Sequence, residues 1–239
     1  MFKSIVRSAI RKSGYDLRRY DCANSDGPRL MAMLKSNGID VVFDVGANNG
    51  QFGQLLRSLG YRGRIVSFEP LSAVWGKLAK TCRKDPLWTA ADRAALGSED
   101  GEIEINVSRM TGSSSALQML KIHTDVAPGS DYIGKERSPL RRLDSVGTQY
   151  LREDSRLFIK IDTQGFEPEV LKGATRLLDR TVGLLLELSL IPLYKDQSLY
   201  DEMIHSVKTM GFDMWAISPG ISDPCTGRLL QADATFFRR

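Results

Sequence analysis

The stretch that decides the fold is Val41-Val42-Phe43-Asp44-Val45-Gly46-Ala47-Asn48-Asn49-Gly50-Gln51-Phe52. An apolar strand pattern runs into a turn with two glycines and then into a helical pattern, an order typical of nucleotide-type cofactor sites. Gly46 and Gly50 let the backbone turn sharply and approach a ligand, because they carry no Cβ. Their spacing is G-x-x-x-G rather than the dinucleotide pattern G-x-G-x-x-G, and Asp44 precedes the turn. An acid at this point disfavours a phosphate ligand.

A second acid follows the next strand pattern, residues 64–68, in the dipeptide Glu69-Pro70. At this position a carboxylate can accept hydrogen bonds from ribose hydroxyls. Two acids around a tight turn suit a cationic nucleoside better than a pyrophosphate. The chain here resembles the class I S-adenosylmethionine-dependent methyltransferases. A different Rossmann-like nucleotide binder is the alternative.

Strand and helix patterns alternate along the remaining chain. Strand patterns occupy residues 41–45, 64–68, 88–94, 156–161, 182–189, 213–217 and 234–238. Helical patterns occupy residues 29–36, 51–58, 73–82, 168–178 and 200–210. This alternation predicts an α/β fold, a Rossmann-like seven-stranded, mostly parallel sheet with helices on both faces. No helical pattern separates the last two strands, so we expect a C-terminal antiparallel hairpin.

The chain is predicted to consist of a short extension and one domain. Its 239 residues are enough for a single well-buried α/β domain. We expect an N-terminal helical extension at residues 1–38 and a class I methyltransferase domain at residues 39–239. Residues 102–107 alternate between polar and apolar, which predicts a hairpin strand, and residues 108–143 look irregular. The inserted hairpin and loop around residues 101–143 would then include a lid or substrate loop.

The most specific motif is a strand, turn and helix at residues 157–174, with the turn Asp162-Thr163-Gln164-Gly165-Phe166-Glu167-Pro168. Asp162 ends the strand, where ligands bind in open α/β sheets, and Glu167 with Pro168 opens the helix. Together with Asp44-Val45-Gly46-Ala47-Asn48 and Phe68-Glu69-Pro70, this motif closely resembles the FkbM family of S-adenosylmethionine-dependent methyltransferases. Similar features are Ser113-Ser114-Ser115-Ala116-Leu117, Arg142-Leu143-Asp144 and Leu186-Glu187. Gln164 stands where the family more usually has glutamate.

The resemblance implies S-adenosylmethionine as cofactor and methyl transfer to an oxygen, commonly a hydroxyl of a sugar, glycolipid or polyketide-type molecule. It implies that Glu69 binds the ribose hydroxyls and that Asp92, or alternatively Asp100 or a backbone group, approaches the adenine amino group. The amino-acid end of the cofactor would lie among residues of the first turn and helix. These residues are Asp44, Gly46, Asn48 and Gly50, with Gln51, Phe52 and Pro70 as further cofactor contacts.

Three residues are candidates for catalysis. Asp162 is the best general base by position, and its alternative role is to bind cofactor or cap the following helix. Glu187 ends an apolar strand, so it should bind a substrate hydroxyl or pair with Lys160. His123 is the only histidine in the irregular central segment, and it is either a base or a solvated loop residue. Lys160 either reaches out of the sheet or contributes a charge to the site.

Composition narrows the set of partners and compartments. The formal net charge is +4 and the Lys and Arg residues are scattered, so we expect no nucleic-acid partner. Cys22, Cys82 and Cys225 form no C-x-x-C pair and predict free thiols in a reducing compartment. No stretch approaches the roughly 18 apolar residues of a membrane span. These features favour a cytoplasmic protein. Asp162 and Glu187 could suit a hard divalent cation, but no ligand spacing demands a metal.

The first twenty residues have a pattern of their own. Phe2, Ile5, Val6, Ala9 and Ile10 recur at helical spacing, with Lys and Arg residues between them. One interpretation is peripheral membrane contact through residues 1–20, because a basic amphipathic helix can bind anionic lipid. The other, which we favour because the apolar stripe is short and lacks Trp, is a helix packed on the domain.

The leading hypothesis is therefore an S-adenosylmethionine-dependent O-methyltransferase acting on a small-molecule or lipid-linked hydroxyl. A methyltransferase of RNA or protein would need a basic docking face near the carboxyl edge of the sheet. A third hypothesis is a catalytically silent, methyltransferase-like binding module. Both cofactor motifs argue against it, whereas Gln164 argues for it.

Overall fold

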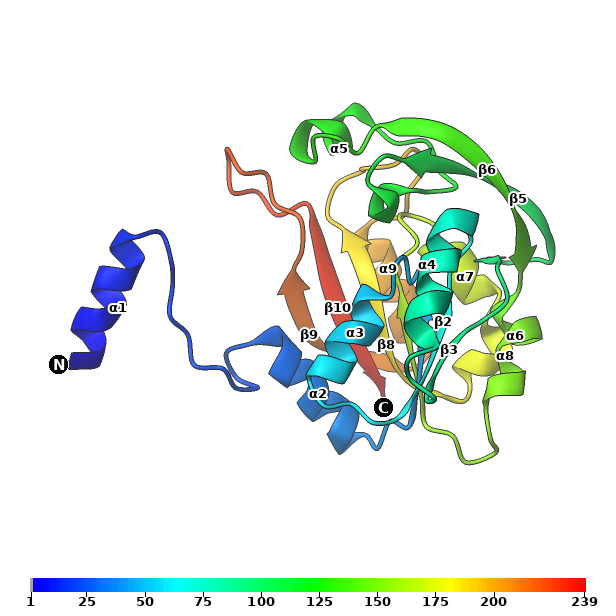
Figure 1. The fold of residues 1–239 in the computed structure, drawn as a ribbon, viewed down its shortest axis with the longest axis horizontal. Helices are drawn as coiled ribbons and strands as arrows, with labels where there is room; N and C mark the ends of the chain where they lie inside the picture. Colours follow the sequence, from blue (N-terminus) through cyan, green and yellow to red (C-terminus); the bar gives the residue numbers. More distant parts are fainter. Residues whose placement is uncertain (1) are drawn as a thin grey trace.

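The computed structural model describes residues 2–239, except for the side chains of residues 2–5 and 9. Its centre is a seven-stranded sheet in the order β3-β2-β1-β7-β8-β10-β9 (Figure 1). The strands are β1 (Val41–Val45), β2 (Arg64–Phe68), β3 (Trp88–Ala90), β7 (Leu157–Ile161), β8 (Thr181–Ser189), β9 (Phe212–Pro219) and β10 (Gln231–Arg238). The first five pair in parallel, and β10 pairs antiparallel with both β8 and β9. The predicted fold class and C-terminal hairpin are confirmed.

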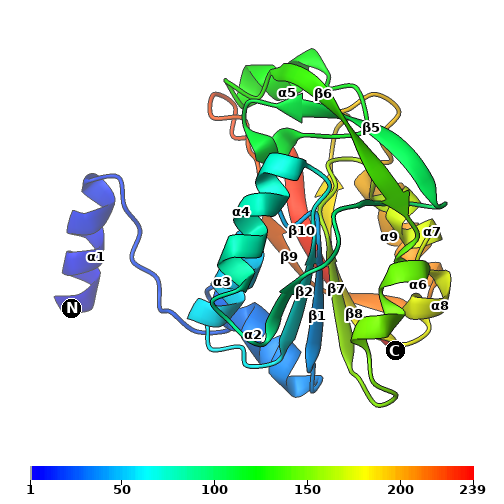
Figure 2. The same ribbon diagram turned by 45° about the vertical axis from the view of Figure 1, so that its right-hand side comes forward.

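Helices cover both faces of this sheet, as Figure 2 shows nearly edge-on. One face carries α2 (Asp26–Ser36), α3 (Gln51–Ser58) and α4 (Ser72–Cys82). The other carries α6 (Leu143–Val146), α7 (Glu167–Lys172), α8 (Thr175–Leu178) and α9 (Tyr200–Thr209). The prediction of a single helix at residues 168–178 is wrong, because the segment forms two helices, α7 and α8, which are separated at Gly173 and Ala174. A Cβ on Gly173 would lie 1.8 Å from the carbonyl oxygen of Gly97, so the close packing of these two segments requires glycine there.

Strand β1 illustrates how two cores form on one sheet. Val41, Phe43 and Val45 belong to the cluster on the face of α7 and α8, whereas Val42 belongs to the cluster with α2 and α3. Every residue of β1 is buried, because helices cover both faces. Asp44 shares the face of Val42 and is therefore a carboxylate within a core.

A second, three-stranded sheet lies over the carboxyl edge of the main sheet (Figures 1 and 2). It consists of β4 (Ala95–Leu96), β6 (Tyr132–Arg141) and β5 (Gly101–Ser108), in that order. The predicted hairpin strand is confirmed, but the prediction that residues 108–143 are irregular is wrong. They include β6, helix α5 (Lys121–Val126) and the short 3₁₀ helix η1 (Thr111–Ser113). A second 3₁₀ helix, η2 (Thr148–Tyr150), follows this segment. Gly134 and Pro139 have low strand propensity, so β6 was not predicted from the sequence. Its strand conformation depends on pairing with β5.

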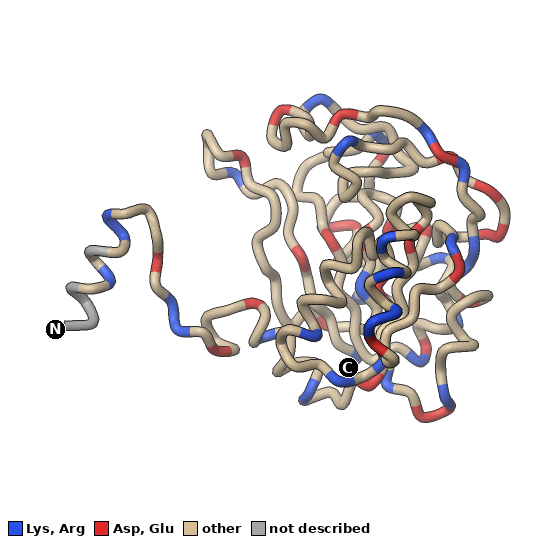
Figure 3. Tube along the Cα trace, in the orientation of Figure 1, with Lys and Arg blue, Asp and Glu red and all other residues tan. Residues whose placement is uncertain are grey.

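Helix α1 (Phe2–Lys12) stands apart from the sheets and their helices in both views (Figures 1 and 2). The favoured interpretation, a helix packed on the domain through Phe2, Ile5, Val6, Ala9 and Ile10, does not agree with this position; the side chains of Phe2, Ile5 and Ala9 lie outside the described residues. Val6 and Ile10 are half-buried, and residues 13–20 are exposed. Figure 3 shows basic residues along α1, and both signs of charge in the segment after it and along the rest of the chain. The division at residue 38 remains a prediction.

Candidate active site

A cavity of about 510 Å³ opens at the carboxyl ends of β1, β2 and β7, within the range of small-molecule sites. It continues along the sheet face beneath α2 and α3, so it has two arms. We call the first the β1–β2 arm; it is lined by Val45, Gly46, Ala47, Asn48, Phe68, Glu69, Pro70, Leu71, Ala94, Ala95, Leu96, Ile103, Ile105, Thr111, Gly112, Ser114, Ser115, Ala116 and Phe166. We call the second the α2–β10 arm; it is lined by Asp26, Gly27, Arg29, Leu30, Met33, Gln51, Phe52, Leu55, Leu185, Ala216, Ser218, Pro219, Asp233 and Thr235. Lys160, Asp162, Thr163 and Gln164 lie where the arms meet.

The turn after β1 and the turn after β7 touch at the centre of the cavity. Gly46 has φ +72°, a conformation that disfavours side chains, and a Cβ there would lie 1.8 Å from the carbonyl oxygen of Asp162. Asn48 and Gln164 also have positive φ values, 48° and 55°. Two strained turns are therefore packed against each other, which is common where a backbone shapes a ligand site.

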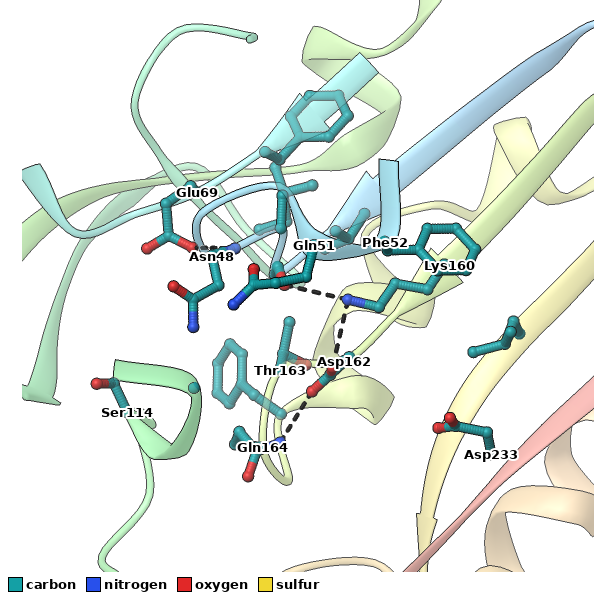
Figure 4. A pocket seen from close by; sticks show the side chains of 18 of the residues that line it. Asn48, Gln51, Phe52, Glu69, Ser114, Lys160, Asp162, Thr163, Gln164 and Asp233 are labelled. Carbon is teal, nitrogen blue, oxygen red and sulfur yellow. Dashed lines mark hydrogen bonds and ion pairs between the residues drawn. The ribbon is translucent and has the colours of Figure 1, made fainter. Parts of the chain in front are cut away.

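Glu69 organises the β1–β2 arm. Its carboxylate accepts hydrogen bonds from the backbone N–H groups of Asn48 and Leu71, both at 2.9 Å (Figure 4). Burial raises the pKa of Glu69 to about 7, although these two hydrogen bonds and the charge of Lys160 lower it in part. Each carboxylate oxygen can accept a further hydrogen bond, so Glu69 can still bind ribose hydroxyls.

Lys160 is a buried charge at the junction of the arms. Its Nζ lies 3.3 Å from Asp44 Oδ1 and 3.3 Å from Asp162 Oδ2, and it donates a hydrogen bond to the carbonyl of Gly46 at 3.1 Å. The pairing of β1 with β7 places Asp44 and Lys160 side by side. Lys160 therefore does not reach out of the sheet into solvent but contributes a charge to the site.

Opposing effects act on this buried pair. Burial alone would lower the pKa of Lys160, but the carboxylates of Asp162 and Asp44 more than offset that and raise it above the ordinary range. Burial raises the pKa of Asp44, and Lys160 counteracts part of that rise. Because Lys160 has two carboxylate neighbours, it is charged and stabilises Asp44 in the core.

Gln164 links the carboxylates at the ends of β7 and β8. Its Nε2 donates to Asp162 Oδ1 at 2.8 Å and to Glu187 Oε2 at 2.7 Å. Glu187 also accepts a hydrogen bond from Gln231 at 2.9 Å. Burial and the neighbouring carboxylates raise the pKa of Glu187 well above its usual range. Glu187 does not line the cavity and does not pair with Lys160, so the structure brings it beside the site but not into it.

His123 is wholly buried rather than solvated. Its Nδ1 lies 3.0 Å from Ser130 Oγ and its Nε2 lies 3.2 Å from the Tyr194 hydroxyl. Tyr194 in turn donates to Gln164 Oε1 at 2.8 Å. Burial lowers the pKa of His123. His123 therefore supports the turn of Gln164 through Tyr194, and it does not reach the cavity.

Six of the nine predicted cofactor residues line the cavity: Gly46, Asn48, Gln51, Phe52, Glu69 and Pro70. The other three do not. Asp44 is fully buried beneath Lys160, and Gly50 packs against Trp88 and Leu78. Asp92 lines a separate, smaller depression of about 190 Å³ beside Tyr150, because β3 ends at Ala90 and the chain turns away.

Sequence reasoning missed the walls of the α2–β10 arm. Asp233 and Thr235 lie in the middle of β10, and Leu30 and Met33 belong to α2. No local signal marks Asp233 as a site residue, because it is one of several polar residues in β10, with Gln231, Thr235 and Arg238. Only the position of β10 between β8 and β9 brings it to the cavity.

Three further findings bear on the predicted chemistry. Among the described residues, no three His, Cys, Asp or Glu side chains gather in an arrangement that could hold a metal ion. Cys22, Cys82 and Cys225 are free thiols. In the described part of the chain, no helix has the length and apolar character needed to cross a membrane.

Comparison with known proteins gives the family. The methyltransferase FkbM domain model matches residues 44–214, which is more than half of the chain and includes both turns at the cavity. The chain belongs to the FkbM family of S-adenosylmethionine-dependent methyltransferases. The resemblance seen in the sequence is therefore confirmed. No match was found among curated proteins.

Solved structures include several methyltransferases similar to this FkbM-family protein. A methyltransferase FkbM from Methylobacillus flagellatus is 13% identical, with a TM-score of 0.48 over 83% of this chain and 43% of that chain. The magnesium protoporphyrin IX methyltransferase from Synechocystis is 12% identical, with a TM-score of 0.46 over 99% and 97%. Fibrillarin from Aeropyrum pernix is 12% identical, with a TM-score of 0.46 over 87% and 74%. This chain thus spans less than half of the Methylobacillus chain.

Proposed function

We propose that this protein is an O-methyltransferase that binds S-adenosylmethionine in the β1–β2 arm and methylates a hydroxyl of a sugar, glycolipid or polyketide-type acceptor beside Asp162. The observation that carries the proposal is one continuous cavity joining Glu69, the acid after β2, to Asp162, the acid after β7. Acids at these two strand ends suit a ribose and a reacting hydroxyl respectively.

The residues of the β1–β2 arm fit S-adenosylmethionine. Glu69 offers a buried carboxylate to the ribose, and Gly46 lines the arm in a turn that packs closely against the backbone of Asp162. Leu71, Leu96 and Ile105 form an apolar wall that suits an adenine ring. Asn48 in this arm and Gln51, the nearest polar residue of the α2–β10 arm, lie side by side between Glu69 and Lys160, where the amino-acid end would bind (Figure 4).

The bound cofactor supplies a methyl group on a sulfonium centre. The protein must aim the acceptor oxygen at that methyl group and accept the hydroxyl proton. Asp162 borders the cavity where the arms meet, and Lys160 and Gln164 hold its carboxylate from two sides. A base fixed in this way loses little orientation freedom during the reaction. We therefore assign the proton to Asp162.

Calorimetric titration of the purified protein with S-adenosylmethionine, with NAD as the competing nucleotide, tests the proposed cofactor. Saturable binding of S-adenosylmethionine that NAD does not displace supports the proposal. Binding of NAD alone would replace it with a different Rossmann-like function. Once cofactor binding is established, transfer of a labelled methyl group to hydroxyl acceptors can be measured with Asp162→Asn, which we expect to reduce turnover at least about 100-fold.

We further propose that the protein is cytoplasmic and contacts membranes peripherally through residues 1–20. Helix α1 stands apart from the domain, and Tyr15, Leu17 and Tyr20 are among the most exposed large apolar side chains. Basic residues surround them, including Arg18 and Arg19. Apolar side chains among basic ones are typical of segments that bind anionic lipid surfaces.

Co-sedimentation with vesicles containing phosphatidylserine tests this contact. The full chain should sediment with these vesicles and not with neutral phosphatidylcholine vesicles, and a chain lacking residues 1–20 should stay in solution. Equal sedimentation of both chains would contradict the proposal. Retained binding of S-adenosylmethionine by the shortened chain would show that its domain is still folded.

A further inference from the structure

The α2–β10 arm has an ordered distribution of polar and apolar side chains. The register of β10 with β8 places Asp233 opposite Glu187, at the level of the strand ends, and Thr235 opposite Leu185, deeper along the sheet. Alternate positions of a strand share a face, so Asp233 and Thr235 lie on the same face as Phe237, which belongs to the cluster with α2 and α3. Strand β10 thus presents a carboxylate at the junction with the β1–β2 arm and a neutral hydroxyl deeper in the arm.

The deeper part of this arm has apolar walls. Leu30 and Met33 come from α2, Phe52 and Leu55 from α3, Leu185 from β8 and Ala216 from β9. Met33, Phe52, Leu55 and Ala216 are not fully buried, which leaves apolar surface open to the cavity. Apolar surface that lines a cavity beside a catalytic centre favours an apolar part of a ligand.

Asp233 is the carboxylate at the polar end of this arm. Among the described residues, its side chain makes neither a hydrogen bond nor an ion pair, whereas Asp162 is held by Lys160 and Gln164. Figure 4 shows Asp233 across the cavity from Glu69, beyond Lys160 and Asp162. Asp233 is exposed where the cavity opens to solvent, and a carboxylate with free acceptor oxygens at this place is suited to bind ligand hydroxyls.

We propose that the α2–β10 arm is the acceptor site and that it binds an amphiphile, with the hydroxyl-bearing head on Asp233 and an apolar chain between α2 and strands β8, β10 and β9. This inference rests on the proposed methyltransferase function and specifies its substrate class. The site begins at Asp26 and Gly27 in the first turn of α2, immediately after the exposed segment with Tyr15, Leu17 and Tyr20. An acceptor drawn from a membrane surface would enter there.

Octyl β-glucoside, used below its critical micelle concentration, is a suitable probe because it joins sugar hydroxyls to an alkyl chain. We expect saturable binding to the complex with S-adenosylmethionine, at least 10-fold tighter than that of methyl β-glucoside, since each buried CH₂ contributes roughly fourfold. Binding of S-adenosylmethionine without any preference for the octyl compound would overturn the inference and leave the proposed function standing. Failure of S-adenosylmethionine itself to bind would refute the proposed function instead.

Two variants locate the probe. Ala216→Leu adds a side chain to the apolar wall, and we expect at least 10-fold weaker binding of octyl β-glucoside with unchanged binding of S-adenosylmethionine. Ala32→Leu is the matched control, because Ala32 lies on α2 next to Met33 but is exposed and does not line the cavity. Equal affinities in both variants and the native protein would place the probe elsewhere and overturn the inference.

Asp233→Ala tests the polar end. Loss of hydrogen bonds to a charged acceptor should weaken octyl β-glucoside binding roughly 10-fold or more, while the binding of S-adenosylmethionine stays within twofold. A native affinity for octyl β-glucoside in Asp233→Ala would remove Asp233 from the acceptor site.

Discussion

The two arms of the cavity are built from different kinds of sequence. The β1–β2 arm takes its key groups from turns directly after strands, so Gly46, Asn48 and Glu69 stand in short recognisable motifs. The α2–β10 arm takes Leu30 and Met33 from near the start of the chain and Asp233 from near its end. A turn motif is local, whereas a wall made of side chains on a sheet face exists only once register and strand order are set. The key groups of the β1–β2 arm can thus be recognised in the sequence, whereas the walls of the α2–β10 arm cannot.

The largest effect is expected at the junction, in Lys160→Met. This change leaves Asp44 buried without its cation, and breaking such a pair costs about 3–5 kcal/mol. The loss should be measured by urea unfolding at neutral pH. Because burial raises the pKa of Asp44, protonation relieves the unpaired charge as the pH falls, so the difference from the native protein should shrink at acidic pH.

The double variant Lys160→Met with Asp44→Asn is the control, because it removes the uncompensated charge. It should recover much of the stability at neutral pH. If Lys160→Met alone is as stable as the native protein, the buried pair does not support the junction of the two arms.

The next largest effect is expected where the two turns touch. Gly46→Ala forces a Cβ against the carbonyl of Asp162 and places alanine at φ +72°, which should cost roughly 2–4 kcal/mol of unfolding free energy. Gly60→Ala is the matched control, since Gly60 has φ +92° but open space around the position of a Cβ. It should cost only about 1–2 kcal/mol. Thermal unfolding of both variants separates close approach from backbone strain, and equal losses would mean that the contact between the turns is unimportant.

A smaller effect is expected from pH. Since the pKa of Glu69 is raised to about 7, its carboxylate becomes protonated below that pH and accepts ribose hydrogen bonds less well. Affinity for S-adenosylmethionine should therefore fall roughly 10-fold between pH 8 and pH 6. The free energy of unfolding changes with pH in the opposite direction to cofactor affinity. Because the pKa of Glu69 is raised on folding, its contribution to stability is present at low pH and is lost as the pH rises through 7.

Glu69→Gln distinguishes this group from Glu167, whose pKa burial also raises to about 7, and from Asp233, whose pKa burial and the charge of Asp162 raise to about 6. The variant should bind S-adenosylmethionine with little pH dependence in this range. A pH dependence that persists in Glu69→Gln would assign it to another carboxyl group.

The smallest effect is expected at Asp92, which the sequence suggested as an adenine contact. Asp92→Ala should leave the affinity for S-adenosylmethionine within twofold, because Asp92 lines a separate depression. A large loss of affinity in calorimetry would return Asp92 to the cofactor site and extend the β1–β2 arm beyond Ala94.

These contrasts also show what sequence could predict. The order of strands and helices followed from hydrophobic periodicity, and helix α3 was predicted with its observed bounds, 51–58. Strand β6 was missed because its residues do not alternate and include Gly134 and Pro139; its conformation comes from pairing with β5.

Side-chain roles were harder to predict than backbone elements. Asp162 lies at the cavity, as predicted, because it follows the carboxyl end of a parallel strand, where ligands bind in open α/β sheets. His123 and Glu187 are also residue types that can act in catalysis, but neither lines the cavity. His123 contacts Ser130 and Tyr194, and Glu187 accepts a hydrogen bond from Gln164. Burial of a titratable group cannot be deduced from its neighbours in sequence.

The most direct test of the two-arm cavity is calorimetric titration of S-adenosylmethionine into the native protein, Glu69→Ala and Asp233→Ala. We predict saturable binding by the native protein, a loss of about 100-fold or more in Glu69→Ala, and affinity within twofold of native in Asp233→Ala. Thermal unfolding confirms that each variant is folded. Native affinity in a folded Glu69→Ala, or an equal loss in both variants, would contradict the assignment of cofactor to one arm and acceptor to the other.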